Sequence, residues 1–393
     1  MSTRLRICYL GAYDREHVRN SVIIGGLRRA GVEVIEIHEP IWRDTAERVS
    51  SASRGLLQPR LWYRLARAHA TLAWRYIKTP QHDLVIVGYP GHPELPLARL
   101  LTWLRRKPLL WDALTSLYET VIEDRGLLSP ASPSARLLLQ AEKLLYRLPD
   151  RILIDTHTQA LLIQSRYGIG PKRLRRVWVG APDDLPCTDQ RAPTGGDFRV
   201  VYFGKFIPLH GLEQVLRAAY LLRDQLDIRF ELMGSGQTYP EMRQMAQELG
   251  LDNVRFMPEW LPLNVLAQRV AGAGACLGIF GVAAKTQRVI PTKAYLALAL
   301  GIPLITNDSP GIRELLVPDI HALLCRPNDP ESLAAAILRL RDNPDLAVRL
   351  VRQGRALYDS QGTPAAIAAQ VQAIIAELTL PSMRIPKKKA PRR

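Results

Sequence analysis

The sequence predicts an α/β protein made of two tandem, doubly wound domains that face a central cleft. Three observations predict this. Apolar runs typical of buried strands alternate with helical patterns along the whole chain. The alternation pauses once, at the Pro-, Gly- and polar-rich stretch 185–197, and then restarts. A length of 393 residues with 47% hydrophobic residues suits two globular domains and excludes a disordered chain or a small disulfide scaffold.

The first half opens with a strand, a Gly11-containing turn, a helix closed by Gly31 and a second strand, which is the unit of a parallel sheet. Its predicted strands are 4–10, 32–38, 83–88, 107–111, 151–155 and 177–179. Its predicted helices are 16–30, 60–78 and 137–147. Repetition of this unit predicts a Rossmann-like domain over residues 1–186, followed by a linker at 187–197.

The second half repeats the pattern and predicts a second Rossmann-like domain over residues 198–362. Its predicted strands are 198–203, 228–233, 254–256, 275–279, 303–306 and 322–325. Its predicted helices are 211–225, 239–249, 264–271, 292–300, 310–316, 330–342 and 344–359. A C-terminal helix over 363–380 could pack back on the first domain, and 381–393 reads as a basic, disordered tail.

Charge divides the chain in the same way. The formal charge is +16, of which residues 1–192 carry +10, residues 193–383 carry zero and residues 384–393 carry +6. A basic half beside a neutral half predicts different partners for the two domains. Four widely separated cysteines, no signal-peptide pattern and no apolar run of membrane-spanning length predict a cytoplasmic protein with reduced thiols.

Two glycine-containing turns are candidate phosphate sites. In YFGKFIPLHG, Gly204 permits close backbone approach, and Lys205 and His210 precede a helix that starts near Gly211. Gly234 follows the strand FELM, although the turn lacks a full dinucleotide fingerprint. An ordinary strand-to-helix connection remains the alternative for both.

A third stretch, 278–316, gathers three cations around the start of one helix. Lys285, Arg288 and Lys293 lie close to Pro291, which is typical of a helix start, and cations there would attract an anion. A solvated basic loop is the alternative.

The second half resembles the nucleotide-sugar domain of the retaining GT-B glycosyltransferases of family 4. The segments that carry the resemblance are YFGKFIPLHGLEQVLRAA, FELMGSG, NVRFMPEW, IPTKAYLALALGIPLIT and SPGIRELL, within about 198–335. The first half resembles the family's acceptor domain more loosely. At the positions where the family usually has two glutamates with seven residues between them, this chain has Arg288 and Leu296.

The resemblance implies transfer of a sugar from a nucleoside-diphosphate sugar, with retention, no divalent metal and no cofactor. From their loop positions we expect Lys205, Arg288 and Lys293 to stabilise the leaving phosphate, with His210 as a further candidate. The expected donor-binding set comprises Gly204, His210, Gly234, Trp260, Lys285, Lys293 and Glu314. In the first half, His92 and Asp112 are the catalytic candidates, and Arg19 and Asn20 are the acceptor-side candidates; a helix-capping or loop role is the alternative for these.

The remaining basic surface predicts a membrane partner. Residues 60–78 contain five cations and no acid, interleaved with Trp and Tyr, a pattern typical of interfacial helices. An amphipathic helix that packs on its own sheet is the alternative. The sequence therefore predicts a glycosyltransferase on the inner face of the plasma membrane that acts on a lipid-linked or surface-glycan acceptor. A catalytically impaired relative that binds a glycan, nucleotide or partner is the alternative, and nucleic acid is an unlikely partner because no such module is recognisable.

Overall fold

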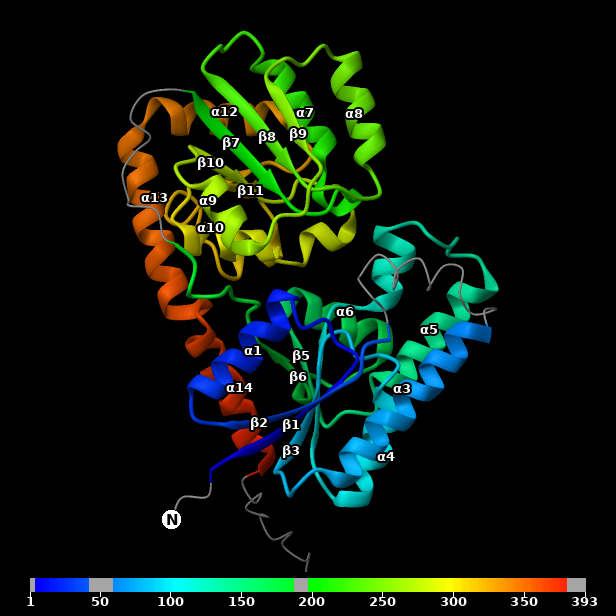
Figure 1. The fold of residues 1–393 in the computed structure, drawn as a ribbon. Coiled ribbons are helices and arrows are strands. Elements are labelled where there is room, and N and C mark those ends of the chain that lie inside the picture. The colour runs from blue at the N-terminus through cyan, green and yellow to red at the C-terminus, as the bar shows by residue number, and fades with distance from the viewer. Residues whose placement is uncertain (1–3, 42–58, 187–196, 380–393) are drawn as a thin grey trace, which may run out of the picture.

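The computed structural model has two α/β domains, one above the other in Figure 1, and describes residues 4–41, 59–186 and 197–379. Each domain contains one parallel six-stranded sheet with helices on both faces. The two-domain α/β class predicted from the sequence is confirmed. The predicted linker, apart from Asp197, and the predicted tail lie outside the described residues.

The first sheet has the strand order β2-β1-β3-β4-β5-β6. Its strands are β1 (Arg6–Gly11), β2 (Glu33–His38), β3 (Leu84–Val87), β4 (Leu109–Leu114), β5 (Arg151–Ile154) and β6 (Leu174–Arg176). Its helices are α1 (Val18–Arg29), α3 (Pro59–Lys78), α4 (Leu95–Arg105), η2 (Glu119–Asp124), α5 (Pro133–Leu145), α6 (His157–Tyr167) and η3 (Pro171–Arg173). The strand predicted at 177–179 is wrong: the last strand ends at Arg176, and the buried residues after it serve as a connection.

The second sheet has the order β12-β11-β10-β7-β8-β9. Its strands are β7 (Phe198–Phe203), β8 (Ile228–Met233), β9 (Val254–Met257), β10 (Ala275–Leu277), β11 (Leu304–Asn307) and β12 (Leu323–Cys325). Its first helices are η4 (Pro208–His210), α7 (Leu212–Leu221), α8 (Tyr239–Glu248), α9 (Leu263–Val270), η5 (Ala284–Gln287) and α10 (Thr292–Leu300). The others are α11 (Pro310–Arg313), α12 (Pro330–Asp342), α13 (Pro344–Leu357) and η6 (Tyr358–Gly362).

Burial on both faces explains why the strands are apolar throughout. All four residues of β3 (LVIV) are completely buried, as expected for a strand covered by helices on either side. The same holds for β10 (ACL) in the second sheet. Because both faces of such a strand are buried, its residues do not alternate between apolar and polar. Continuous apolar runs in the sequence therefore indicate where these strands lie.

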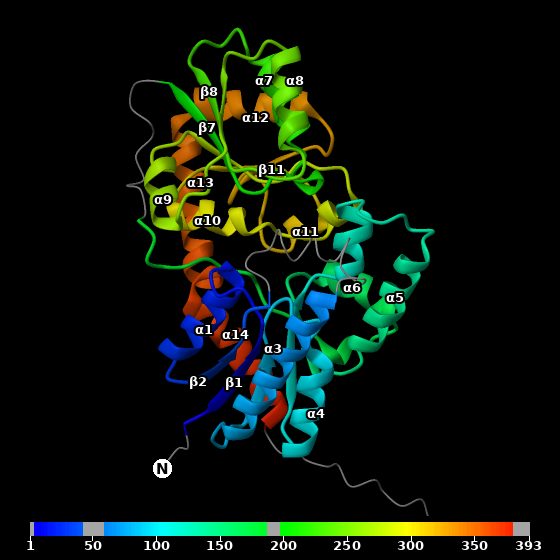
Figure 2. The same ribbon diagram turned by 45° about the vertical axis from the view of Figure 1, so that its right-hand side comes forward.

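Strand order reverses once in each sheet. The carboxyl ends of the strands at both reversals point toward the other domain (Figure 1). In the first sheet β1 lies between β2 and β3, and in the second β7 lies between β8 and β10. Ligands of doubly wound sheets bind beyond the carboxyl ends of the strands at such switch points. Figure 2 shows α6 of the first domain and α11 of the second facing each other between the sheets.

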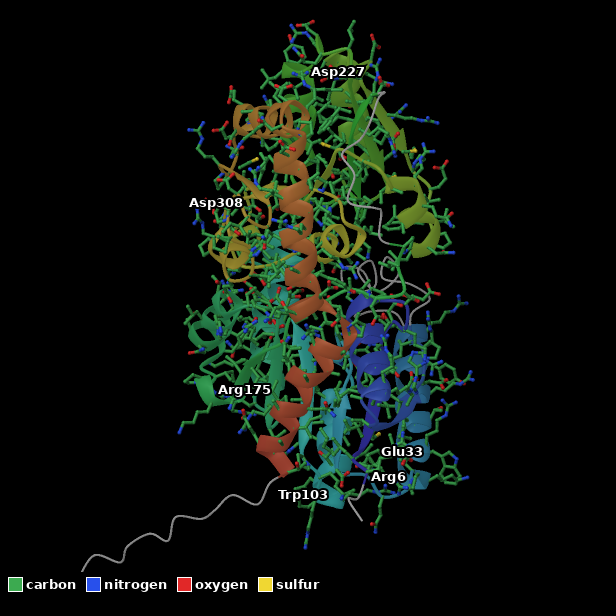
Figure 3. All side chains as sticks on the ribbon, turned by 90° about the vertical axis from the view of Figure 1, so that its left-hand side faces the viewer. Arg6, Glu33, Trp103, Arg175, Asp227 and Asp308 are labelled. Atoms are coloured by element: carbon green, nitrogen blue, oxygen red, sulfur yellow. The ribbon has the colours of Figure 1, made fainter. Side chains whose placement is uncertain are left out.

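The chain returns to the first domain at its end. After α13 and η6, the last helix α14 (Pro364–Thr379) packs against α1 (Figure 3). Gly26 makes this close packing possible, because a Cβ there would lie 2.1 Å from the carbonyl oxygen of Pro364. Tyr358 adds a second tie by donating a hydrogen bond of 2.8 Å to the carbonyl of Pro182.

Candidate functional site

Two glycines shape the switch point of the second sheet. Gly204 follows β7 with φ +137°, and Gly234 follows β8 with φ +118°, conformations that other residues rarely adopt. A Cβ on Gly234 would lie 2.2 Å from the Gly204 carbonyl oxygen, so no side chain fits there. The structure therefore brings these two predicted donor-binding residues into backbone contact at the carboxyl edge of the sheet.

Lys293 extends to the same place from the first turn of α10. Its side chain is buried, and its Nζ lies 3.7 Å from the Tyr202 ring centroid, with no hydrogen-bond acceptor among the residues that the structure describes. Burial lowers the pKa of Lys293 well below its usual value. A buried amine without an anionic partner, beside a glycine loop at a switch point, is suited to receive an anionic ligand.

His210 and Lys205 frame this amine through a small hydrogen-bond network. The Tyr202 hydroxyl donates to the carbonyl oxygen of Lys205 over 2.7 Å and lies 2.6 Å from His210 Nδ1. Burial and then the positive charge of Lys293 hold the pKa of His210 well below its ordinary value. His210 is therefore neutral, which makes it a hydrogen-bonding group rather than a cation.

The other two predicted cations face carboxylates of the first domain. Lys285 Nζ lies 2.9 Å from Thr120 Oγ1 and 3.5 Å from Asp124 Oδ2. Arg288 Nε donates to Glu119 Oε1 over 3.1 Å. Lys285 and Arg288 thus hold the two domains together at η2, and their positive charges are already balanced in this structure.

Glu314 joins the domains at another point. Its carboxylate accepts hydrogen bonds from the backbone N–H groups of His157, at 2.6 Å, and Thr158, at 2.8 Å. Two unpaired N–H groups at the start of α6 are satisfied in this way, and the helix dipole favours the negative charge there. Glu314 caps a helix of the other domain, so its predicted contact with the donor stays a prediction.

Trp260 lies in the loop after β9 and is 61% exposed. An exposed tryptophan beside the carboxyl edge of the sheet leaves its ring free for stacking. Its predicted role in donor binding stays a prediction.

Asp112 and Arg19 form a fully buried ion pair inside the first domain. Both side chains are 0% exposed, with 2.8 Å between Arg19 Nη2 and Asp112 Oδ1. Arg19 Nη1 also donates to the carbonyl oxygens of Val177 and Trp178. No part of either side chain reaches solvent, so the structure gives both a packing role, and their predicted roles in chemistry and acceptor binding stay predictions.

Asn20 and His92 are buried in similar networks. Asn20 accepts from the Tyr9 hydroxyl at 2.9 Å and holds the backbone of Tyr89. His92 Nε2 lies 3.2 Å from Glu142 Oε1, and its ring packs edge-on to Trp111. Burial alone would raise the pKa of Glu142, but hydrogen bonds from His92 and Tyr167 lower it overall. Both residues stabilise loops behind the carboxyl edge of the first sheet.

Sequence reasoning missed the acidic side of the interface. Glu119 and Asp124, which pair with Arg288 and Lys285, come from a segment whose pattern shows no strand or helix signal of its own. Asp155 at the end of β5 was also missed, although it is buried and its Oδ1 has no partner among the described residues. Within the described part of the chain, no three His, Cys, Asp or Glu side chains are grouped to hold a metal ion, and no helix is long and apolar enough to cross a membrane.

Comparison with known proteins shows what the second domain is similar to. Residues 197–343 match the family model described as glycosyl transferases group 1. Among curated proteins, a D-inositol 3-phosphate glycosyltransferase of Thermomonospora curvata is 27% identical over 60% of each chain. An uncharacterised glycosyltransferase of Haemophilus influenzae is 22% identical over 54% of this chain and 58% of its own. The matches thus span a little under two thirds of these relatives' lengths.

Solved structures match over the whole fold. Anabaena HepE in complex with UDP superimposes with a TM-score of 0.66 at 15% identity, covering 96% of this chain and 100% of that one. Sucrose-phosphate synthase from Thermosynechococcus elongatus gives 0.69 at 19% identity, covering 95% and 99%. The chain therefore has the GT-B fold, and its second half is similar to the glycosyl transferases group 1 family over residues 197–343.

Proposed function

We propose that the protein is a glycosyltransferase that moves a sugar from a nucleoside-diphosphate sugar to a lipid-linked or surface-glycan acceptor, with retention and without a metal. One observation carries the donor half of the proposal: the Lys293 amine beside Gly204 at the switch point is buried and has no hydrogen-bond partner among the described residues. The glycosyl transferases group 1 match over the same domain supports it, as does UDP in the complex with HepE.

The proposed chemistry is stabilisation of the leaving diphosphate. As the glycosidic bond breaks, negative charge grows on the β-phosphate, and a cation beside that phosphate lowers the barrier. Lys293 would take up a proton when the diphosphate arrives, because a nearby anion favours the charged amine. His210 and Lys205 lie in the adjoining loop. Lys285 and Arg288 would reach the donor only by exchanging their partners Asp124 and Glu119.

A second candidate function, binding without turnover, rests on Leu296. This residue occupies the position of the family's second glutamate and is 6% exposed within α10, so it accepts no hydrogen bond from a donor ribose. A protein of this kind would bind a nucleotide or glycan and release it unchanged. Turnover, rather than binding, separates the two functions.

The test is a panel of UDP- and GDP-sugars assayed by thermal shift and by release of nucleoside diphosphate. We expect one of them to raise the melting temperature and to be consumed when an acceptor is present, and NMR of the product should show the donor's anomeric configuration kept. Binding with no turnover on any acceptor would favour the second function. If no nucleotide or nucleotide sugar bound, both the proposed transfer from a donor and nucleotide binding without turnover would be wrong.

Lys293→Met tests whether the buried Lys293 amine binds the diphosphate. It should lower affinity for the bound nucleotide by about 10- to 100-fold, the worth of one charge-assisted hydrogen bond. The free energy of unfolding should not fall, because the buried amine has no hydrogen-bond acceptor among the described residues to lose. Lys172→Met, at an exposed surface position, is the matched control. Unchanged affinity in Lys293→Met would place the diphosphate elsewhere.

We also propose a peripheral, cytoplasmic location on an anionic membrane. On α3, Leu72 and Tyr76 face the sheet and are buried, while Trp62, Tyr63 and Trp74 are more than half exposed beside the helix's cations. Removing 384–393, or neutralising Arg60, Arg64 and Arg67 together, should weaken binding to anionic vesicles and leave nucleotide binding unchanged. Loss of nucleotide binding would contradict the proposal that these cations serve membrane binding and not nucleotide binding.

A further inference from the structure

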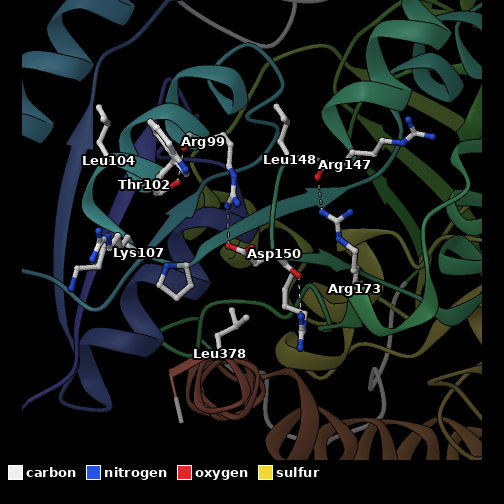
Figure 4. A pocket seen from close by; sticks show the side chains of 13 residues that line it. Arg99, Thr102, Leu104, Lys107, Arg147, Leu148, Asp150, Arg173 and Leu378 are labelled. Carbon is white, nitrogen blue, oxygen red and sulfur yellow. Dashed lines mark hydrogen bonds and ion pairs between the residues drawn. The ribbon is translucent and has the colours of Figure 1, made fainter. Parts of the chain in front are cut away.

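A cavity of about 1030 Å³ opens at the end of the first domain that lies away from the second domain. It lies where β4 and β5 begin and α4, α5 and α14 end (Figure 4). The proposed donor site lies at the opposite, carboxyl edge of the strands, in the other domain. Nothing in the proposed transfer reaction uses this cavity.

The lining is strongly cationic. Six of its side chains are basic and one is acidic; the basic ones are Arg99, Arg106, Lys107, Arg147, Arg151 and Arg173. The single acid, Asp150, is already engaged by Arg99 at 3.2 Å and by the Leu109 N–H at 2.8 Å. Glu377 of α14 also lies 3.7 Å from Arg151. The ends of α4, α5 and α14 each offer about half a negative charge, so roughly two to three positive charges in the cavity remain uncompensated.

The cations that line this cavity differ in whether their side chains already have hydrogen-bond partners. Arg173 donates to the carbonyl oxygens of Arg147 and Pro149, and Arg151 to that of Asp150. Arg106, Lys107 and Arg147 have no side-chain hydrogen bond or ion pair to the residues that the structure describes. Burial lowers the pKa of Arg173, and the neighbouring Arg99 and Arg151 lower it further. The cluster repels itself and would be stabilised by an anion.

The rim of the cavity is apolar. Trp103 and Leu104 line it and are 67% and 64% exposed. Ile77, at the end of α3, is 61% exposed and lies next to this rim, because Arg105 of α4 donates to the Ile77 carbonyl at 2.6 Å. Figure 3 shows Trp103 at the foot of the first domain. A cationic hollow with an apolar border matches a ligand that has an anionic head on an apolar body.

We propose that this cavity binds the phosphate headgroup of an anionic membrane lipid, with Trp103, Leu104 and Ile77 inserted at the boundary of the acyl region. The charge of the hollow suits a phosphate, which Arg side chains bind in a forked geometry. The exposed tryptophan suits the membrane interface, where an indole ring has both apolar and polar surroundings. The site is independent of the proposed transfer reaction and gives the membrane-bound enzyme a fixed orientation.

The test is flotation of the full-length protein with vesicles of phosphatidylcholine and of phosphatidylcholine mixed with phosphatidylglycerol. A triple variant, Arg106→Gln, Lys107→Gln and Arg147→Gln, should lose about 100-fold in partitioning to the anionic vesicles, since three cations leave the contact. The matched control removes three exposed arginines elsewhere, Arg136, Arg349 and Arg352, each to Gln, and should lose no more than about threefold.

Trp103→Ser keeps the charge and should weaken vesicle binding by about tenfold. Unchanged melting temperatures would show that the variants are folded. Equal losses in the two triple variants would overturn the proposal, because net charge alone would then explain binding. A melting-temperature rise with soluble glycerol phosphate, abolished by the pocket triple variant but with no difference between the variants on vesicles, would also overturn it and identify a free phosphate ester as the ligand.

Discussion

Arg288 of the second domain forms an ion pair with Glu119 of the first, and Glu119 is completely buried. Gln159 donates to the other oxygen of the same carboxylate at 2.8 Å, so Glu119 has a partner on each side. A cation of the second domain thus meets a buried glutamate of the first domain. This pair connects the proposed donor site to the domain interface.

Arg288→Ala should lower the free energy of unfolding by about 3–5 kcal/mol, because it leaves a buried carboxylate unpaired. Adding Glu119→Gln should recover part of that loss, since a neutral amide costs less to bury. Urea unfolding of the two single variants and the double variant measures the coupling. If Arg288→Ala were as stable as the natural protein but no longer bound nucleotide, the arginine would belong to the donor site and not to the interface.

The buried pair of Arg19 and Asp112 leads to a second prediction. Asp112→Ala removes the only carboxylate that the Arg19 guanidinium contacts among the described residues, and should destabilise the first domain by about 3–5 kcal/mol. Nucleotide affinity should stay within about twofold of the natural value, because the second domain is untouched. Urea unfolding and nucleotide titration are the two measurements. A stable variant that binds donor and does not turn it over would restore the catalytic role expected from the sequence.

Gly234→Ala tests the backbone contact at the switch point. The change should cost more than about 3 kcal/mol and weaken nucleotide binding, because it combines an unfavourable φ with a clash against the Gly204 carbonyl. Gly250→Ala is the matched control: its φ is also positive, at +62°, but nothing lies within 4 Å of the added Cβ. The control should cost only about 1–2 kcal/mol. Similar losses in both variants would mean that φ alone matters and that the loops can separate.

How well each feature of the fold and the site could be predicted from the sequence depends on how far apart along the chain the interacting residues lie. Strands such as β3 and β10 were predictable because both faces are buried and local composition alone reveals that. The glycines at 204 and 234 were predictable because a turn of that kind needs them. The partners of Lys285, Arg288 and Glu314 were not, because each lies more than 150 positions away along the chain. A cation in a loop looks the same in sequence whether it awaits a phosphate or already pairs with a carboxylate.

Asp155 makes stability depend on pH. It lies at the end of β5, buried between the domains, and burial raises its pKa to about 7 despite the attraction of Arg19 and the Ile290 N–H. Between about pH 4 and pH 7, the Asp155 carboxyl therefore holds a proton in the folded state that it has released in the unfolded chain, where its pKa is near 3.8. Stability contributed by this group is present at low pH and is lost as the pH rises from about 4 to about 7.

Asp155→Asn should remove that loss. The amide oxygen can still accept from Ile290, and no charge is buried at high pH. The variant should gain up to about 4 kcal/mol over the natural protein at pH 8 and less at pH 5, since three pKa units correspond to about that free energy. Urea midpoints at the two pH values measure the effect, with Asp184→Asn, an exposed carboxylate, as the control. An equal difference at both pH values would show that Asp155 stays charged in the folded protein and is neutralised by Arg19 instead.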